Sequence, residues 1–312
     1  MSDGDSHLDD VRLDQSNRIA RRVAHGAYRI LHAHRVVGDE AWGIFGMLSG
    51  GYRLLTEIEQ DWPVPHQQRI CLDVDARWQP RTLWVQVDAE GERHSAKFTV
   101  AGSVVSIDIQ QAALQAEDQP ARAPAVSRGQ VQVGLQPAGS SASGGADQPA
   151  RIVLNRATIR EDEELTSPFD SSRIRTATAS RRTTSRTRLP FGAATHLDFA
   201  SAFSNFIVLQ RADLPPGGST HLDAIVPALP GLVPLRIEQT YACEGEEPLR
   251  GDPAKPLTRR YQITERQQGN APAVITTPTT FWADGHGIVL AQELAINGET
   301  HGCEMVRYTW LG

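Results

Sequence analysis

The sequence predicts an all-β protein in which two antiparallel β-meander sheets, related by approximate duplication, curl around an apolar interior. Residues 70–78 alternate between apolar and polar side chains, the period of two that buries one face of a strand. When residues 70–100 are moved forward by 207 positions, Val74 falls on Phe281 and Gly91 on Gly298, with apolar and turn positions in phase. The connections between these runs are short, which favours antiparallel pairing.

The first half reads as a series of strands separated by glycine turns. Strands are expected at residues 28–35, 41–48 and 52–60, with a Gly-Asp turn at 37–40. In the next run, Ile70, Leu72, Val74, Ala76 and Trp78 share the buried face, and Gln79-Pro80-Arg81 interrupts it. A hairpin signal at 88–91 and a strand at 104–109 close the first meander.

A polar tract separates the halves. Residues 111–150 are rich in Ala, Gln, Pro, Gly and Ser, and residues 174–188 contain mainly Arg, Ser and Thr. Such a composition cannot bury enough apolar area to offset the entropy of the chain. The predicted organisation is therefore a flexible N-terminus (1–22), a first β-meander half (23–110), a disordered insertion (111–188) with at most one short strand at 130–135, and a second half (189–312).

The second half begins with an apolar run at 205–209, for which we expect a strand. A Pro-Pro-Gly-Gly turn, strands at 221–226 and 235–243, and the echo of the opening stretch follow. Both halves are expected to form one continuous β domain.

Composition excludes several classes of protein. A net charge of −6 gives no support for nucleic-acid binding. The three widely spaced cysteines are neither a disulfide framework nor a metal-ligand pattern. The polar N-terminus lacks the features of a signal peptide, and no apolar run is long enough for a membrane helix. The simplest expectation is a cytoplasmic protein without a cofactor.

The sequence contains no familiar catalytic or phosphate-binding motif, so an enzyme is the less favoured interpretation. His94 and His301 follow equivalent hairpin turns, and His32 and His34 lie two residues apart on an expected strand. Either pair could chelate a metal. Solvated histidines are the favoured interpretation, because the sequence places no further ligand beside either pair, and no metal site is predicted.

Aromatic residues on or beside the predicted strands allow two interpretations. They either pack the core, or line an apolar concavity in which a lipid tail lies while a cation meets the head group at the rim. The candidate ligand-binding residues are Trp78, Arg81, Trp84, Asn205, Phe206, Arg211, Tyr241 and Trp282.

The order of several short segments resembles the family of bacterial proteins described as glycolipid-binding. The shared features include a Phe-x-Asn segment (203–205), a Pro-Gly turn (216–217), a Gln-x-Tyr strand (239–241), a closing Asp-x-x-Gly-x-Val hairpin (284–289) and the set Asp75, Trp78 and Arg81. The resemblance covers roughly residues 40–110 and 195–310, and the insertion between the halves departs from it. It implies binding of a glycolipid or a similar molecule.

The resulting hypothesis is a soluble protein that holds a lipid, glycolipid or similar amphipathic small molecule in a β-lined apolar cleft. One alternative is an isomerase- or cyclase-type enzyme that uses Asp73, Asp75 or Asp284 in the same cavity. The other is a protein-interaction module that acts through residues 111–188.

Overall fold

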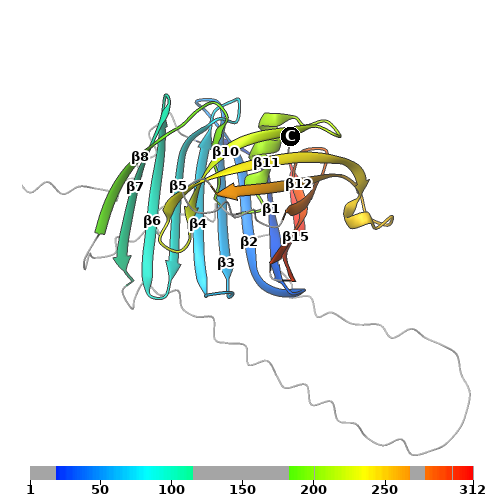
Figure 1. Cartoon of the computed structure of the whole chain (residues 1–312), viewed down its shortest axis with the longest axis horizontal. Helices are drawn as coiled ribbons and strands as arrows, with labels where there is room; N and C mark the ends of the chain where they lie inside the picture. The colour runs from blue at the N-terminus through cyan, green and yellow to red at the C-terminus, as the bar shows by residue number, and fades with distance from the viewer. Residues whose placement is uncertain (1–18, 115–182, 200, 268–277, 297, 312) are drawn as a thin grey trace, which may run out of the picture.

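The computed structural model describes residues 19–114, 183–199, 201–267, 278–296 and 298–311 (Figure 1). The strands of this part of the chain are β1 (Ile19–His32), β2 (Arg35–Met47), β3 (Tyr52–Gln60), β4 (His66–Val74), β5 (Pro80–Ala89), β6 (Glu92–Ala101), β7 (Val104–Ala113), β8 (Thr183–Pro190), β9 (Thr195–Leu197), β10 (Ser219–Ala228), β11 (Val233–Pro248), β12 (Leu257–Gln267), β13 (Thr279–Ala283), β14 (Val289–Ile296) and β15 (Glu299–Trp310). Helix α1 (Ser204–Ala212) and the 3-10 helix η3 (Leu249–Gly251) complete it.

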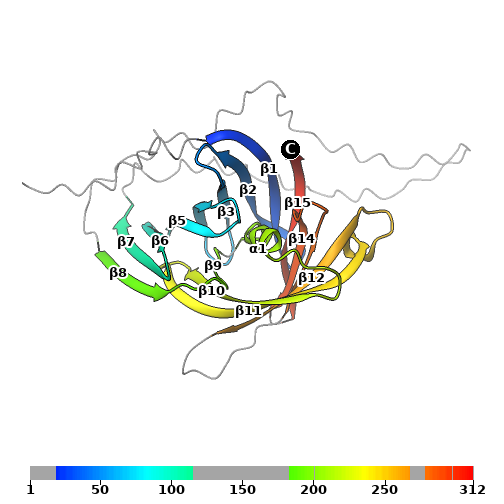
Figure 2. The same ribbon diagram turned by 90° about the horizontal axis from the view of Figure 1, so that it is seen from above.

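All these strands belong to one 15-stranded sheet in the order β8-β7-β6-β5-β4-β3-β2-β1-β15-β14-β13-β12-β11-β10-β9. Neighbouring strands are antiparallel except β9 and β10, which are parallel. The first strand, β1, pairs with the last, β15, so the two meanders are continuous through this pair instead of forming separate sheets. Figure 2 shows the sheet curling around helix α1, which lies inside the curve.

Alternation along the strands accounts for the inner face. In β4 the buried residues are Gln68, Ile70, Leu72 and Val74, each separated by a half-buried one. The predicted hairpin after β5 is confirmed: Glu90 and Gly91 connect β5 to β6 with φ angles of 52° and 81°, the left-handed pair that a two-residue hairpin loop requires. The all-β antiparallel fold predicted from the sequence is therefore confirmed. The duplication and the division into two halves stay predictions.

The turn predicted at residues 37–40 is wrong. β1 and β2 turn earlier, at Ala33 and His34, whose φ angles of 47° and 64° place them in the left-handed region. Gly38 lies within β2, where a Cβ atom would approach the Glu59 carbonyl oxygen to 2.4 Å. A glycine is therefore needed at position 38 because β2 and β3 approach closely there, and not because the chain turns.

The polar insertion is shorter than predicted at both ends. Residues 111–113 continue β7, and residues 183–188 form most of β8, which pairs with it. An ion pair between Arg186 and Asp108, 2.5 Å apart, joins the two strands. Alternating Thr and Arg suit an edge strand, because β-branched residues favour extended backbone and charge discourages further pairing.

Residues 19–22, which the sequence places in the flexible N-terminus, likewise lie in β1. The short strand considered at 130–135 lies outside the described residues.

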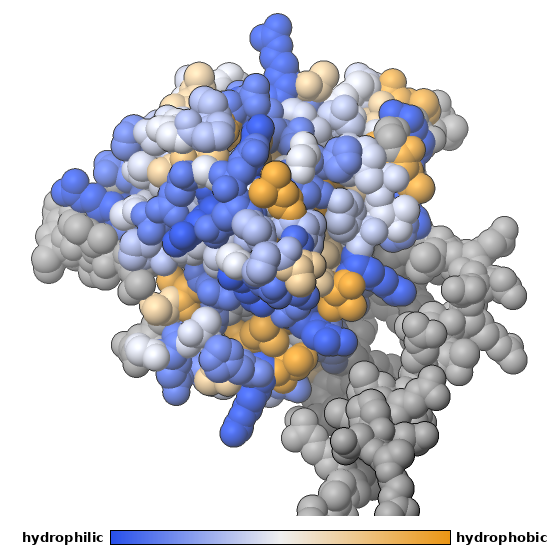
Figure 3. All heavy atoms as spheres, turned by 90° about the vertical axis from the view of Figure 1, so that its right-hand side faces the viewer, coloured by the Kyte–Doolittle hydropathy of each residue, from blue (hydrophilic) through white to orange (hydrophobic). Residues whose placement is uncertain are grey.

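Two clusters of buried side chains form the core. The larger one packs the inner faces of β1–β7 against Phe203, Phe206 and Ile207, and the smaller one packs β11–β14 against Val208 and Leu209. The face shown in Figure 3 is mostly hydrophilic with separate apolar patches. Within the described ranges, no helix has both the length and the apolar character needed to cross a bilayer.

Replacing Gly302 with alanine tests the tight pairing of β14 and β15. A Cβ atom at this position would lie 2.0 Å from the Gln292 carbonyl oxygen, so the strands must separate. We expect Gly302→Ala to lower the free energy of unfolding by roughly 2 kcal/mol, measured by urea denaturation. Gly231→Ala is the matched control, because nothing lies within 4 Å of its added Cβ. Equal stability of the two variants would contradict this account of the pairing.

Candidate ligand-binding site

Helix α1 occupies the interior that the sequence predicts as an apolar cleft. Its residues Ser204, Asn205, Phe206, Ile207, Val208 and Leu209 are all buried. The strand predicted at 205–209 is therefore wrong. The apolar run has no pattern that separates a short strand from a buried helix. Here the surrounding sheet supplies partners on every side of the segment, so tertiary packing overrides its strand propensity.

Four of the predicted site residues meet around this helix. The Tyr241 hydroxyl donates to Asn205 Oδ1 at 3.0 Å, and Asn205 Nδ2 donates to Gln292 Oε1 at 2.9 Å. The Phe206 ring meets the edge of Trp78 with 5.1 Å between ring centroids. These contacts bind α1 to its surroundings: Asn205 pairs with Tyr241 of β11, and Phe206 packs against Trp78 of the turn after β4.

The two predicted rim cations have different hydrogen-bond partners. Arg81, whose side chain is 63% exposed, donates to Asp75 Oδ2 at 2.9 Å. Arg211 donates to the backbone oxygen of Ala193 at 2.9 Å. Burial lowers the pKa of Arg211, and its electrostatic interaction with Asp75 opposes that shift. Arg81 therefore lies at the surface, next to the turn that contains Trp78.

The remaining two predicted residues lie on the opposite face of the sheet from the core. Trp84 alternates with Leu83 and Val85, which are fully buried, and is itself half-buried. Trp282 alternates with Phe281 and Ala283 of the inner core in the same way. Its indole nitrogen donates to Glu247 Oε1 at 2.7 Å.

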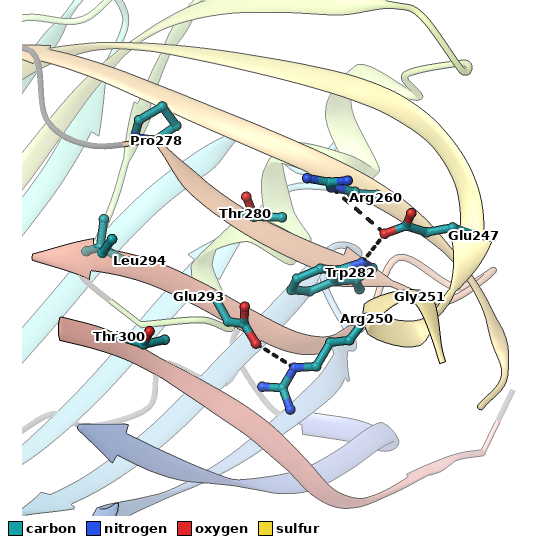
Figure 4. Close-up of a pocket in the computed structure, with 11 residues that line it drawn as sticks. Glu247, Arg250, Gly251, Arg260, Pro278, Thr280, Trp282, Glu293, Leu294 and Thr300 are labelled. Carbon is teal, nitrogen blue, oxygen red and sulfur yellow. Dashed lines mark hydrogen bonds and ion pairs between the residues drawn. The ribbon is translucent and has the colours of Figure 1, made fainter. Parts of the chain in front are cut away.

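Trp282 lines a cavity of about 470 Å³ between β11, η3 and the strands β12–β15 (Figure 4). Two ion pairs border it: Arg250 with Glu293 at 2.7 Å, and Arg260 with Glu247 at 3.9 Å. Arg260 Nε also lies 2.9 Å from Glu244 Oε2, yet makes no hydrogen bond there. The cavity therefore combines an aromatic ring with arginines paired to glutamates and a donor that has no aligned acceptor.

The apolar part of the lining lies on the side away from η3. It consists of Pro278, Leu294 and Ala295, and the hydroxyl-bearing Thr280 and Thr300 also line the cavity. In Figure 4, Pro278 and Leu294 lie on the opposite side of the view from Glu247 and Arg250. The site is thus amphipathic along its length.

A second polar group lies deep in the interior and was not predicted. Glu40 of β2 is 2% exposed and accepts a hydrogen bond from the Ser201 hydroxyl. Burial raises its pKa to about 7, and the bond from Ser201 opposes the shift. The Tyr28 hydroxyl is also buried and has no hydrogen-bond partner among the described residues. The sequence places Asp39-Glu40 in a predicted turn, whereas the alternation of Glu40 with Trp42 and Ile44 puts it on the buried face.

The carboxylates considered for an enzyme are engaged in structure. Asp73 forms an ion pair with Arg53 at 2.6 Å. Asp75 and Asp284 each accept two backbone N–H bonds in a tight turn. In Asp75 these bonds, together with Arg81, lower the carboxyl pKa against the effect of burial. These three side chains hold turns and strands together.

One group of three potential metal ligands occurs among the described residues. It consists of His32, Glu299 and His301, whose ligand atoms lie within 4.8 Å of one another. His301 thus meets His32 of the first strand, whereas the sequence suggests the pairs His94 with His301 and His32 with His34. His34 lies in the turn after β1.

Comparisons with known proteins add two similar structures. No protein-family model and no curated protein matches the chain. A β-barrel-like protein of domain of unknown function DUF1849 from Brucella abortus is 8% identical, with 95% of this chain and 100% of that chain covered and a TM-score of 0.46. A DUF1089 family protein from Pseudomonas aeruginosa is 13% identical, with 80% and 87% covered and a TM-score of 0.37. Neither description names a glycolipid, and the resemblance drawn from the sequence stays a prediction.

The buried Glu40 predicts how stability depends on pH. Its pKa rises from 4.5 in the unfolded chain to about 7 in the fold, so the folded state binds the proton more tightly. Its contribution is complete below pH 4.5 and is lost as the pH rises through 7. Between pH 4.5 and pH 8 the wild type should lose roughly 3 kcal/mol relative to Glu40→Gln, measured by urea denaturation at each pH.

The exposed Glu59→Gln provides the control for this comparison, because Glu59 lies on the neighbouring strand β3 at the surface. Its stability should follow the wild-type pH profile. A Glu40→Gln profile parallel to that of the wild type would rule out a raised pKa at Glu40.

Proposed function

We propose that the protein binds an amphipathic small molecule whose uncharged, hydroxyl-bearing head group lies against Trp282. The observation that carries this proposal is the cavity of about 470 Å³ in which Trp282 meets two Arg–Glu pairs. Its volume falls within the range of about 300–1,000 Å³ that is usual for small-molecule sites. The lining is more polar than is usual for such a site, and an aromatic ring among polar groups suits a ligand that has both an apolar face and hydroxyl groups.

The charges of the lining favour a neutral head group. Arg250 and Arg260 line the cavity together with Glu247 and Glu293, and each arginine has a second glutamate beside it, Glu304 and Glu244 respectively. A ligand with a net charge would therefore meet like charge as well as opposite charge. A hydroxyl group donates to a carboxylate and accepts from a guanidinium, and it can therefore bind both members of a pair. A sugar presents several such hydroxyls around an apolar face.

The apolar end of the lining gives the proposal its amphipathic character. Leu294 and Ala295 offer contact to a hydrocarbon segment that leaves the head group. The sequence resemblance to glycolipid-binding proteins is consistent with this class of ligand. Among the residues predicted from the sequence, Trp282 contacts the ligand in this proposal, whereas Asn205, Phe206 and Tyr241 support it indirectly by fixing α1.

The proposal is tested by titrating the full chain with octyl β-glucoside, methyl β-glucoside and octanoate, using calorimetry and native mass spectrometry. Octyl β-glucoside should bind with one-to-one stoichiometry and more tightly than either fragment. Trp282→Ala should weaken it at least about tenfold, as expected for the loss of a central aromatic contact, and Trp282→Phe should retain part of the affinity.

The matched control is Trp84→Phe, which removes an indole from the same face of the first half without reaching the cavity. It should leave the affinity unchanged. The proposal fails if none of the probes binds, or if Trp282→Ala binds octyl β-glucoside as tightly as the wild type. Tighter binding of octanoate than of the glucosides would exclude the neutral head group.

A further inference from the structure

We propose that His32, His301 and Glu299 form a binding site for a divalent transition-metal ion, of the Zn²⁺, Ni²⁺ or Cu²⁺ class, that links β1 and β15, the first and last strands along the described chain. The site is independent of the cavity at Trp282. It lies at the end of the β1–β15 pair, where the two halves of the protein meet.

The pairing register brings the two histidines together. His32 is the last residue of β1 and is the direct partner of His301 in β15. Directly opposed residues on antiparallel strands have Cβ atoms about 5 Å apart, which suits joint coordination. The two Nδ1 atoms lie 3.1 Å from each other. The positions are fixed by strand pairing and not by flexible loops, so the site is largely organised before an ion arrives.

The distances fit coordination of one ion. Zn²⁺ binds imidazole nitrogen at about 2.0–2.1 Å, and two such ligands in tetrahedral geometry are separated by about 3.3 Å. The observed 3.1 Å between the Nδ1 atoms therefore requires only a small adjustment. Imidazole and carboxylate ligands favour Zn, Cu and Ni over hard cations such as Mg²⁺.

Glu299 adds a carboxylate on the other side of His32. Its Oε2 atom lies 3.4 Å from His32 Nε2. A carboxylate that accepts the Nε2–H of a ligating histidine fixes the tautomer in which Nδ1 carries a free lone pair. The Glu299 side chain is 58% exposed, so it can also turn toward the ion as a third ligand.

Trp62 covers the pair from the connection between β3 and β4. Its ring stacks on His32 with 3.8 Å between centroids and 12° between planes, and it lies 4.9 Å from the His301 ring. The stacked indole holds the imidazoles in place and provides a fluorescent reporter.

The contact can also form without a metal, if one Nδ1–H donates to the other Nδ1. The two explanations differ in what happens when an ion is offered. The chain supplies two matched controls. His94 lies 3.3 Å from Glu92 in the corresponding hairpin of the first half, and His286 stacks on Trp310 with 4.4 Å between centroids.

Calorimetric titration of the full chain with ZnCl₂ and with NiSO₄ at pH 7.5 tests the site directly. The wild type should bind one ion of each with a micromolar dissociation constant. His32→Ala and His301→Ala should each weaken binding at least about 100-fold, and Glu299→Gln about tenfold, the usual cost of losing a supporting carboxylate. His94→Ala and His286→Ala should bind as the wild type does. Circular dichroism of each variant establishes that it is folded.

Two further readouts separate a bound ion from a merely structural role for the histidines. Cu²⁺ should quench indole emission in the wild type, and Trp62→Phe should remove most of that quenching while Zn²⁺ binding persists. Zn²⁺ at a concentration 100-fold above its dissociation constant should raise Tm by about 5 °C or more, and this shift should vanish in His301→Ala.

The proposal is overturned if the wild type binds no Zn²⁺ or Ni²⁺ at concentrations up to 1 mM, in which case the histidines share a proton. It is also overturned if His32→Ala and His301→Ala retain wild-type affinity, or if His94→Ala loses as much affinity as they do. Any of these results leaves the proposed ligand site at Trp282 untouched.

Discussion

The burial of helix α1 inside the curled sheet is the constraint on which the rest of the structure depends. A sheet whose inner face is apolar must cover that face, and here residues of the same chain cover it from within. The polar atoms that the helix carries inward must then find partners. Asn205 finds two, Tyr241 and Gln292, on separate strands of the second half. These bonds connect α1 to β11 and β14. Strand β13, which carries Trp282 on its outer face, lies between these two strands in the sheet.

This arrangement changes where a ligand is expected. Aromatic residues that the sequence assigns to a cleft instead pack against the helix. Protein interiors are close-packed and contain few voids, so side chains of the protein itself fill this space. The outer face of β12–β14 differs, since β11 extends beyond it and η3 returns across it. That overhang shelters Trp282, whose relative exposure is 6%, without filling the space beside it. A convex sheet surface acquires a concave site only where another segment crosses it in this way.

The sequence predicts the strands well and the contacts between distant segments poorly. Alternation identifies the buried face of residues 70–74, and a Glu-Gly pair identifies the hairpin at 90–91, because both signals are local. The extension of the alternation to Ala76 and Trp78 is wrong, because β4 ends at Val74 and both residues lie in the turn that follows, where Ala76 is exposed and Trp78 has a positive φ. The helix at 204–212 carries no such signal, since an apolar run surrounded by core has no exposed face. The alternation of buried positions through Glu40 and Trp42 could have identified Glu40 as a buried residue. The meeting of His32 with His301 depends on β1 pairing with β15, across 269 positions, and no pattern in either strand specifies that partner.

Two turns show how one helix is held by both halves of the chain. In each, an aspartate accepts backbone N–H bonds from residues two and four positions later: Asp75 from Arg77 and Gln79, and Asp284 from His286 and Ile288. Each turn contains a residue with positive φ, Trp78 or Gly287. The first turn reaches α1 through the ring of Trp78 against Phe206. The second reaches it through the His286 carbonyl, which accepts from Gln210 at 2.8 Å. A Cβ atom at Gly287 would lie 2.8 Å from Gln210 Nε2, so a side chain there would displace the amide that binds the His286 carbonyl. The second turn thus holds the helix through its backbone next to a glycine, whereas the first holds it through the side chain of Trp78.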